Sequence, residues 1–175
     1  MTDAAATTNG SAVMETEKVI LMSKDQKKFE VSRAVAKMSG LVADMIEEYE
    51  DETPEAPLMN VTGKVLKKVL EFCEQHVAAP MEEIKKPLRT NDMSQVVSEW
   101  DANFVEIPQE ELFELILAAN FLDIKSLLDL TCAKVASMIK GKTPEEIRKT
   151  FNIVNDFTPE EEKQVREENK WCEEA

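Results

Sequence analysis

Residue types that build catalytic sites are scarce in this sequence of 175 residues. It contains a single histidine, His76, and four scattered glycines, Gly10, Gly40, Gly63 and Gly141. Every histidine-based triad would have to use His76, and isolated glycines cannot form the glycine-rich loop that holds phosphate. We therefore predict that the protein is not an enzyme.

Metal-ligating residues are also few. The three cysteines, Cys73, Cys132 and Cys172, stand far apart, which is typical of a reduced intracellular protein. Cys73 and His76 could share one helical face, but a structural zinc site needs about four ligands and no second pair lies nearby. We predict no metal and no cofactor, with Cys73 in the core and His76 exposed near the end of a helix.

Positive charge and long apolar runs are limited as well. There are 21 basic against 35 acidic residues, a net charge of −14, and the only basic cluster is Lys85, Lys86 and Arg89. This charge repels phosphate backbones, so nucleic-acid binding is not expected. No stretch approaches 18 apolar residues, and the N-terminus lacks the basic start of a signal peptide. We expect no membrane span, and a cytoplasmic and nuclear location.

The N-terminal half has a mixed α/β pattern. Residues 1–16 are small and polar and predict a flexible leader. Apolar residues at 19–22 and alternating residues at 29–31 predict a hairpin, and 58–61 predicts a short third strand. Apolar positions at helical spacing predict helices that begin after Ser32, Ser39 and Thr62, each serving as the N-cap. Between 80 and 98 the composition turns charged and polar, which indicates an irregular and mobile excursion.

The C-terminal half predicts successive helices. Residues 112–122 are apolar nearly all the way round, which is typical of a buried central helix. Asp123 is interpreted as the N-cap of the next helix, and Gly141 as its C-terminal stop. Thr143 then opens a third helix with Pro144 and a capping-box glutamate.

A last helix is predicted to begin at Thr158 with the same four-residue opening. From Glu160 to Lys170 only Val165 is aliphatic, so this helix has no apolar stripe to anchor it. Trp171 follows almost at the terminus. Such a helix is either frayed or completed by the apolar surface of another molecule.

The segment FELILAANFLDIKSLLDLTCAKVASMIKGKTPEEIRKTFNI, followed by NDFTPEEEKQVREENKWCEE, resembles the Skp family, the adaptors of Skp-cullin-F-box ubiquitin ligases. The segments ILMSKDQKKFEV and VTGKVLKKVLEFCEQHV fit in the right order. The resemblance implies an α/β fold: a BTB/POZ-type body with a small three-stranded sheet and a C-terminal helical extension. It implies a cullin-binding body over 17–124 and C-terminal helices over 111–175 that form an F-box-binding surface.

The resemblance also implies site residues. The cullin contact maps onto Asn120 and Phe121, where members of the family generally have tyrosine at the second position. The residues that map onto the F-box surface are mostly apolar and are Phe113, Leu128, Cys132, Val135, Ile139, Phe151, Ile153 and Trp171. For each of these, internal packing is the alternative interpretation. Tryptophan is a frequent interface anchor, so Trp171→Ala is expected to weaken F-box binding and spare the cullin.

The expected function is that of a non-catalytic adaptor, which links F-box proteins to a cullin scaffold in ubiquitin-dependent protein degradation. Two alternatives remain. A self-associating module is possible because an unoccupied apolar surface favours a homodimer of the free protein. A small hydrolase would have to lose turnover when His76 is replaced.

Overall fold

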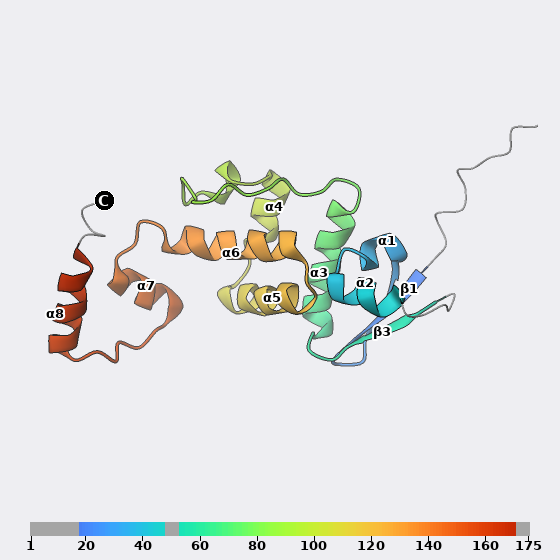
Figure 1. Cartoon of the computed structure of the whole chain (residues 1–175), viewed down its shortest axis with the longest axis horizontal. Helices are drawn as coiled ribbons and strands as arrows, with labels where there is room; N and C mark the ends of the chain where they lie inside the picture. The colour runs from blue at the N-terminus through green and yellow to red at the C-terminus, as the bar shows by residue number, and fades with distance from the viewer. Residues whose placement is uncertain (1–17, 48–52, 171–175) are drawn as a thin grey trace, which may run out of the picture. The chain divides into compact units, whose positions relative to one another are not determined.

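A computed structural model of the chain describes residues 18–47 and 53–170 (Figure 1). The chain divides into two compact units, residues 1–137 and 138–175. We refer to the described part of the first as the body and to residues 138–170 as the C-terminal unit. The predicted leader and Trp171 lie outside the described residues.

The body contains a three-stranded sheet in the order β2-β1-β3. Strands β1 (Lys18–Ser23) and β2 (Lys28–Ser32) are antiparallel, so the predicted hairpin is confirmed. Strand β3 (Glu55–Leu58) pairs parallel to β1 and lies earlier than the predicted 58–61. The predicted bounds were wrong because the apolar run begins after Pro57, whereas a strand at the edge of a sheet tolerates a proline within it.

The turn of the hairpin is connected to the start of helix α3 (Gly63–His76). The Asp25 carboxylate accepts a hydrogen bond of 2.6 Å from the Gly63 N–H and one of 2.9 Å from Ser23 Oγ. These donors, together with Lys27, hold the pKa of Asp25 well below its usual range. Thr62 is the N-cap residue of α3, as predicted, but its side chain makes no cap hydrogen bond. The Asp25 carboxylate instead accepts the hydrogen bond from the first backbone N–H group of α3, that of Gly63.

Glycine at position 63 makes this contact possible. A Cβ atom there would stand 2.7 Å from Lys27 Cδ and 3.1 Å from Asp25 Oδ1. Any larger residue would therefore displace the turn from the helix. The turn of the hairpin can approach the start of α3 closely because Gly63 has no side chain.

The helices of the body follow the apolar spacing of the sequence. Their bounds are α1 Arg33–Ala36, α2 Gly40–Glu47, α3 Gly63–His76, α4 Glu99–Phe104, α5 Gln109–Phe121 and α6 Lys125–Ile139, the last of which reaches the C-terminal unit. The predicted caps at Ser32 and Ser39 are confirmed by bonds from the N–H groups of Val35 and Val42. Helix α3 packs against α5. Val19, Leu66 and Phe72 lie at the centre of the core.

Helix α5 is buried on one side only. Leu112 and Leu115 are almost fully buried, whereas Leu117 is 70% exposed and Phe113 is 39% exposed. The prediction of a helix buried all round was therefore wrong. Apolar composition on every face indicated complete burial, but the body covers a single face of this helix.

The link between α5 and α6 also differs from the prediction. Asp123 has a φ of 51°, in the left-handed region, and α6 begins two residues later at Lys125. Asp123 is therefore not an N-cap, because a cap residue has extended dihedrals. Its carboxylate occupies the space in which a Cβ of Gly40 would stand. The first residue of α2 must be small for the link to fit.

Residues 80–98 have an irregular backbone, as predicted, apart from the short 3₁₀ helix η1 (Met93–Gln95). Ile84 and Met93 are buried in the core. Lys86 Nζ lies 2.7 Å from Asp129 Oδ1 on α6. The segment is thus anchored by apolar and charged contacts, and its mobility stays a prediction.

The C-terminal unit contains α7 (Pro144–Phe151) and α8 (Pro159–Glu168). Thr143 and Thr158 precede them, and each completes a capping box, as predicted. Gly141 has a φ of 76°, which suits its predicted role in ending α6. Neither α7 nor α8 contains a buried residue.

Candidate partner-binding surfaces

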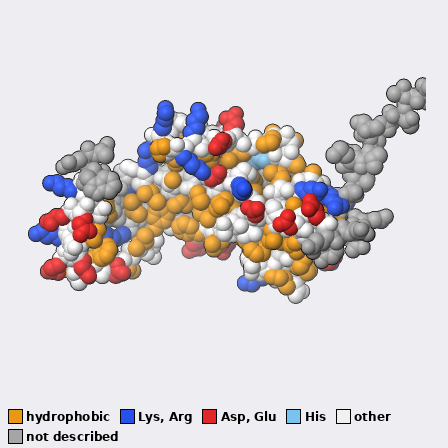
Figure 2. All heavy atoms as spheres, viewed as in Figure 1, with side chains coloured by type: hydrophobic (Ala, Val, Ile, Leu, Met, Phe, Trp, Pro, Cys, Tyr) orange, Lys and Arg blue, Asp and Glu red, His pale blue; other side chains and the backbone are white. Residues whose placement is uncertain are grey.

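One face of α6 carries four of the residues predicted to bind an F-box. Leu128, Cys132, Val135 and Ile139 follow one another at intervals of four, three and four, which places them along one side of the helix. Leu128 packs partly against the core, whereas Cys132 and Ile139 are exposed. Hydrophobic side chains gather over α5 and α6 in the space-filling view (Figure 2).

Helix α5 exposes two apolar side chains, Phe113 and Leu117, which lie one turn apart on the helix. Phe113 was predicted as a site residue, whereas Leu117 was assigned to the core and is instead strongly exposed. No property of Leu117 in the sequence distinguishes it from the buried Leu115. Only the packing of α5 shows which leucine reaches the surface.

The two residues predicted to contact a cullin lie at the end of α5. Asn120 is exposed, and Phe121 is half-buried and packs against the core. The Leu122 N–H closes the helix by donating to the Ala118 carbonyl at 2.9 Å. The amide of Asn120 is therefore presented from a fixed helix end.

The C-terminal unit exposes further apolar side chains. Of the predicted residues, Phe151 is half-buried and Ile153 is 54% exposed. The sequence analysis missed Val154, which is 83% exposed, and Phe157, which is also exposed. Both lie in the link between α7 and α8, together with Ile153.

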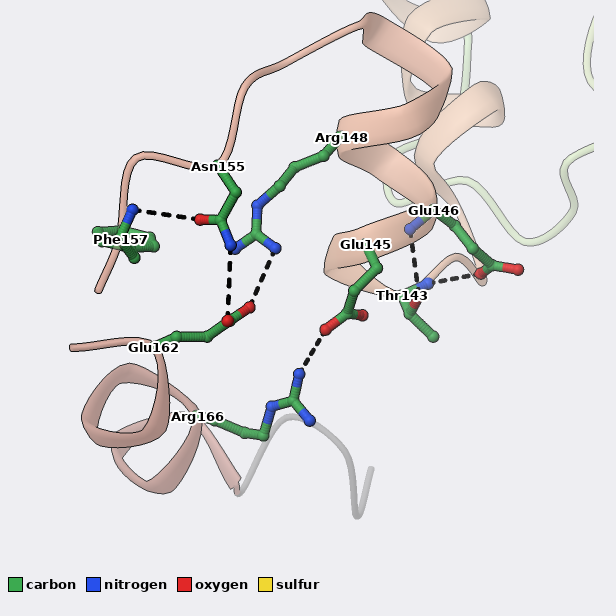
Figure 3. Close-up of polar contacts among 8 residues, drawn as sticks. All are labelled: Thr143, Glu145, Glu146, Arg148, Asn155, Phe157, Glu162 and Arg166. Atoms are coloured by element: carbon green, nitrogen blue, oxygen red, sulfur yellow. Dashed lines mark hydrogen bonds and ion pairs between the residues drawn. The ribbon is translucent and has the colours of Figure 1, made fainter. Parts of the chain in front are cut away.

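Polar contacts join α7 to α8 within this unit (Figure 3). Arg148 Nη1 lies 3.2 Å from Glu162 Oε1, and Arg166 forms an ion pair with Glu145. Asn155 Nδ2 donates to the other oxygen of Glu162 at 3.5 Å. Ion pairs near the surface contribute little each, so this framework is weak compared with a hydrophobic core.

Carboxylates at the helix starts are stabilised in their charged form. The backbone N–H of Thr158 and then its hydroxyl lower the pKa of Glu161. The Glu145 backbone N–H and then the Thr143 hydroxyl lower the pKa of Glu145. Glu161 completes the capping box of α8 and Glu145 lies in the first turn of α7. Both remain ionised near neutral pH, so they are poor proton donors for catalysis.

His76 is buried, which corrects the prediction of an exposed histidine. Its Nε2 lies 2.8 Å from Asp101 Oδ1, and Trp100 packs edge-on against its ring. The prediction failed because α4 comes from a distant part of the sequence and covers the end of α3. Cys73 is in the core, as predicted, and burial raises its pKa to about 12. This thiol is therefore not a ready nucleophile.

The part of the chain that the structure describes contains no group of three or more metal-ligating side chains. None of its helices has the length and apolar content needed to cross a membrane.

The residues that were predicted to bind an F-box are distributed over both units of the chain. Phe113, Leu128, Cys132 and Val135 belong to the body, whereas Ile139, Phe151 and Ile153 belong to the C-terminal unit.

Comparison with known proteins gives two family matches. A model described as the Skp1 family dimerisation domain matches residues 125–172, and one described as the Skp1 family tetramerisation domain matches residues 17–78. The second is a POZ-type domain, in agreement with the predicted body and its three-stranded sheet. The predicted fold class is confirmed.

Curated relatives match over most of their length. The chain is 57% identical over 159 residues to the S-phase kinase-associated protein 1 homolog of Tetrahymena thermophila, covering 90% of this chain and 95% of that protein. It is 54% identical over 161 residues to SKP1-like protein 1A of Arabidopsis thaliana, covering 91% and 99%. It is 51% identical over 158 residues to the SCF ubiquitin ligase complex protein SKP1a of Dictyostelium discoideum, covering 89% and 95%. Matches of this identity, together with both family models, show that the chain belongs to the Skp1 family.

Proposed function

We propose that the protein is a non-catalytic adaptor of an SCF ubiquitin ligase, in which it links F-box proteins to a cullin. The relative from Dictyostelium discoideum is named as an SCF ubiquitin ligase complex protein, and this chain is 51% identical to it. Family membership is the observation that carries the proposal. The adaptor acts by positioning two partners, so it needs two binding surfaces and no reacting group.

The F-box surface is proposed to include Phe113, Leu128, Cys132, Val135, Ile139, Phe151, Ile153 and Trp171. Its support is the exposed apolar character of several members, of which Phe113, Ile139 and Ile153 are between 38% and 54% exposed. Covering these side chains with an apolar partner would remove them from water, which is favourable. Val154 and Phe157 belong to the same exposed apolar set and are added to the proposal.

The cullin surface is proposed to lie at Asn120 and Phe121. Asn120 offers an amide that donates and accepts hydrogen bonds, next to a half-buried aromatic ring. The two proposed surfaces use different side chains. A substitution in one surface should therefore weaken the binding of one partner and leave the binding of the other unchanged.

The experiment compares three exposed positions by affinity measurement with one F-box protein and one cullin. Ile139→Asp should weaken F-box binding by about tenfold or more and leave cullin binding intact, since a charge would be buried in an apolar contact. Asn120→Arg should show the reverse pattern. Met59→Asp is the control, because Met59 is 62% exposed and lies outside both proposed surfaces. Retention of both partners by all three variants would contradict the assignment of the surfaces.

Self-association is the second candidate function. The matched description of residues 125–172 as a dimerisation domain favours it, and a homodimer of the free protein was one alternative from the sequence. Light scattering over a concentration series tests it with and without an F-box peptide. If the apolar surface serves both purposes, the peptide should dissociate the dimer.

A further inference from the structure

The two edges of the sheet differ in their ability to pair with another strand. Strand β3 forms one edge and carries Pro57, which has no backbone N–H to offer a further strand. Strand β2 forms the other edge, and its sequence KFEVS contains no proline. An edge strand with free N–H and C=O groups is a template for pairing with another chain. The sheet can therefore be extended at β2.

The pairing of the hairpin fixes which backbone groups of β2 point outward. The Ser23 N–H donates to the Lys27 carbonyl at 2.9 Å, so residue 27 faces β1. Backbone direction alternates along an antiparallel pair, and Phe29, two residues further on, also faces β1. The N–H and C=O groups of Lys28 and Glu30 therefore point away from β1. In the part of the chain that the structure describes, no backbone group bonds to them there.

The side chains of this edge are of two kinds. Lys28 and Glu30 lie on the exposed face of the sheet, whereas Phe29 is half-buried and packs against the core. Lys28 Nζ lies 2.7 Å from Glu55 Oε1, and Glu30 forms an ion pair with Lys18. All four charged side chains are well exposed, and ion pairs of this kind are weak. Lys28 and Glu30 are thus available to charges on another molecule.

We propose that β2 pairs with β2 of a second copy of this chain, antiparallel and around a two-fold axis at Phe29. In this register Lys28 lies opposite the second copy's Glu30, and Glu30 lies opposite its Lys28. Each opposed pair exchanges both N–H···O=C bonds, because both residues turn their backbone outward. The two Phe29 rings face each other on the core side. Opposite charges and aromatic rings directly across a strand pair are both stabilising.

Other two-fold registers of this edge are less favourable. An axis at Glu30 would place two glutamates directly opposite each other, and like charges in that position destabilise a strand pair. An axis at Val31 would place Lys28 opposite Ala34, which belongs to helix α1 and not to a strand. An axis between two residues would set outward backbone groups opposite groups that face β1. The sequence Lys-Phe-Glu is therefore complementary to itself in one register.

This interface is separate from both proposed partner surfaces. It uses β2, whereas the F-box and cullin residues lie on α5, α6 and the C-terminal unit. Two copies joined at β2 would each retain those residues. The inference consequently does not rest on the adaptor function. Pairing of one short strand buries little surface, so the association is weak and depends on concentration.

The test is sedimentation velocity of the full-length chain over a concentration series that reaches about 1 mM. Lys28→Glu sets glutamate against glutamate in both opposed pairs, and Glu30→Lys sets lysine against lysine. Each variant should associate about tenfold more weakly than the natural chain. An equimolar mixture of the two variants should associate again, because each opposed pair then joins a lysine to a glutamate.

Net charge is controlled within the same series. The chain has a net charge of −14, so Lys28→Glu increases the repulsion between copies and Glu30→Lys decreases it. Repulsion alone would strengthen association of the Glu30→Lys variant, whereas pairing at β2 requires both variants to be weaker. Lys24→Glu is the matched control, because Lys24 is exposed in the hairpin turn outside β2. It should associate about as strongly as the natural chain.

Three results would overturn the proposal. They are a natural chain that stays monomeric throughout the series, single variants that associate like the natural chain, and a mixture that associates no better than its components. Association through the C-terminal helices would be equal in all samples and gives the second result. The natural chain also provides a test that needs no variant: the N–H signals of Lys28 and Glu30 should shift with concentration, and constant signals would contradict pairing at β2. None of these results affects the adaptor proposal, which the affinities for an F-box protein and a cullin test.

Discussion

The body and the C-terminal unit are stabilised by different forces. The largest fully buried side chains all lie in the body, between Val19 and Leu130. In the C-terminal unit, α7 and α8 bury none of their residues and rely on two capping boxes and the ion pairs of Arg148 and Arg166. Burial of a large side chain contributes more than an exposed ion pair. The comparison indicates that burial stabilises the body, whereas the C-terminal unit would gain most from being covered by a partner.

The largest expected effect contrasts the same substitution in the two units. Ile46 is 1% exposed in the body, and Ile153 is 54% exposed in the C-terminal unit. Ile46→Ala should lower the free energy of unfolding by about 2–5 kcal/mol through loss of burial and a cavity. Ile153→Ala should change it by less than about 0.5 kcal/mol. Urea denaturation of both variants checks this, and equal losses would remove the contrast between the units.

A smaller effect is expected at the caps of the C-terminal unit. Thr158 accepts the Glu161 N–H and starts α8. Thr158→Ala should reduce the local stability of α8 by about 1 kcal/mol and leave the unfolding midpoint of the body unchanged. Hydrogen exchange of the α8 amides is the measurement. Thr158→Ser keeps the hydroxyl and is the control, and comparable exchange in both variants would show that the cap is not needed.

The ion pairs between α7 and α8 should have a smaller effect again. Arg148→Gln removes the partner of Glu162 and should cost about 0.5 kcal/mol of local stability at low salt. At about 1 M NaCl the loss should nearly vanish, because the Debye length falls to roughly 3 Å. Exchange of α8 amides at two salt concentrations measures it. Lys18→Gln, which removes an exposed pair with Glu30 in the body, should leave α8 unaffected.

The smallest expected effect is the pH dependence of the stability of α8. The pKa of Glu161 is lowered in the folded state by the Thr158 N–H and hydroxyl. Its contribution is therefore present above the pKa that Glu161 has in the unfolded chain, and is lost as pH falls through the lowered folded value. The Cα chemical shifts of α8 should report partial loss of helix in acid. Glu161→Gln keeps the capping oxygen without the titration, so a similar acid loss in that variant would assign it to other groups.

The elements predicted correctly from the sequence are those set by near neighbours in the chain. Ser39, Thr143 and Thr158 bond to N–H groups three residues away, and the hairpin turn closes over five residues. Such contacts can be recognised in a short window of residues. The paired Thr-Pro-Glu-Glu openings were sufficient to locate the starts of α7 and α8.

The wrong predictions of helix caps and of burial concern contacts between distant parts of the chain. Asp25 replaces Thr62 at the start of α3 across 38 residues, and Asp101 meets His76 across 25 residues. Asp123 follows the backbone required by its contact with Gly40 rather than the dihedrals of a cap. A local sequence pattern cannot show whether Thr62 or Asp25 accepts the hydrogen bond at the start of α3. That choice depends on which side chains the folded chain brings together.

For the surfaces, the sequence alone identified the apolar face of α6 and the scarcity of anchoring residues in α8. Which leucine of α5 reaches solvent, and the exposure of Val154 and Phe157, were decided only by tertiary packing. The physical reason is that helical spacing reveals which side chains share a face. Burial depends on whether another element of the chain covers that face.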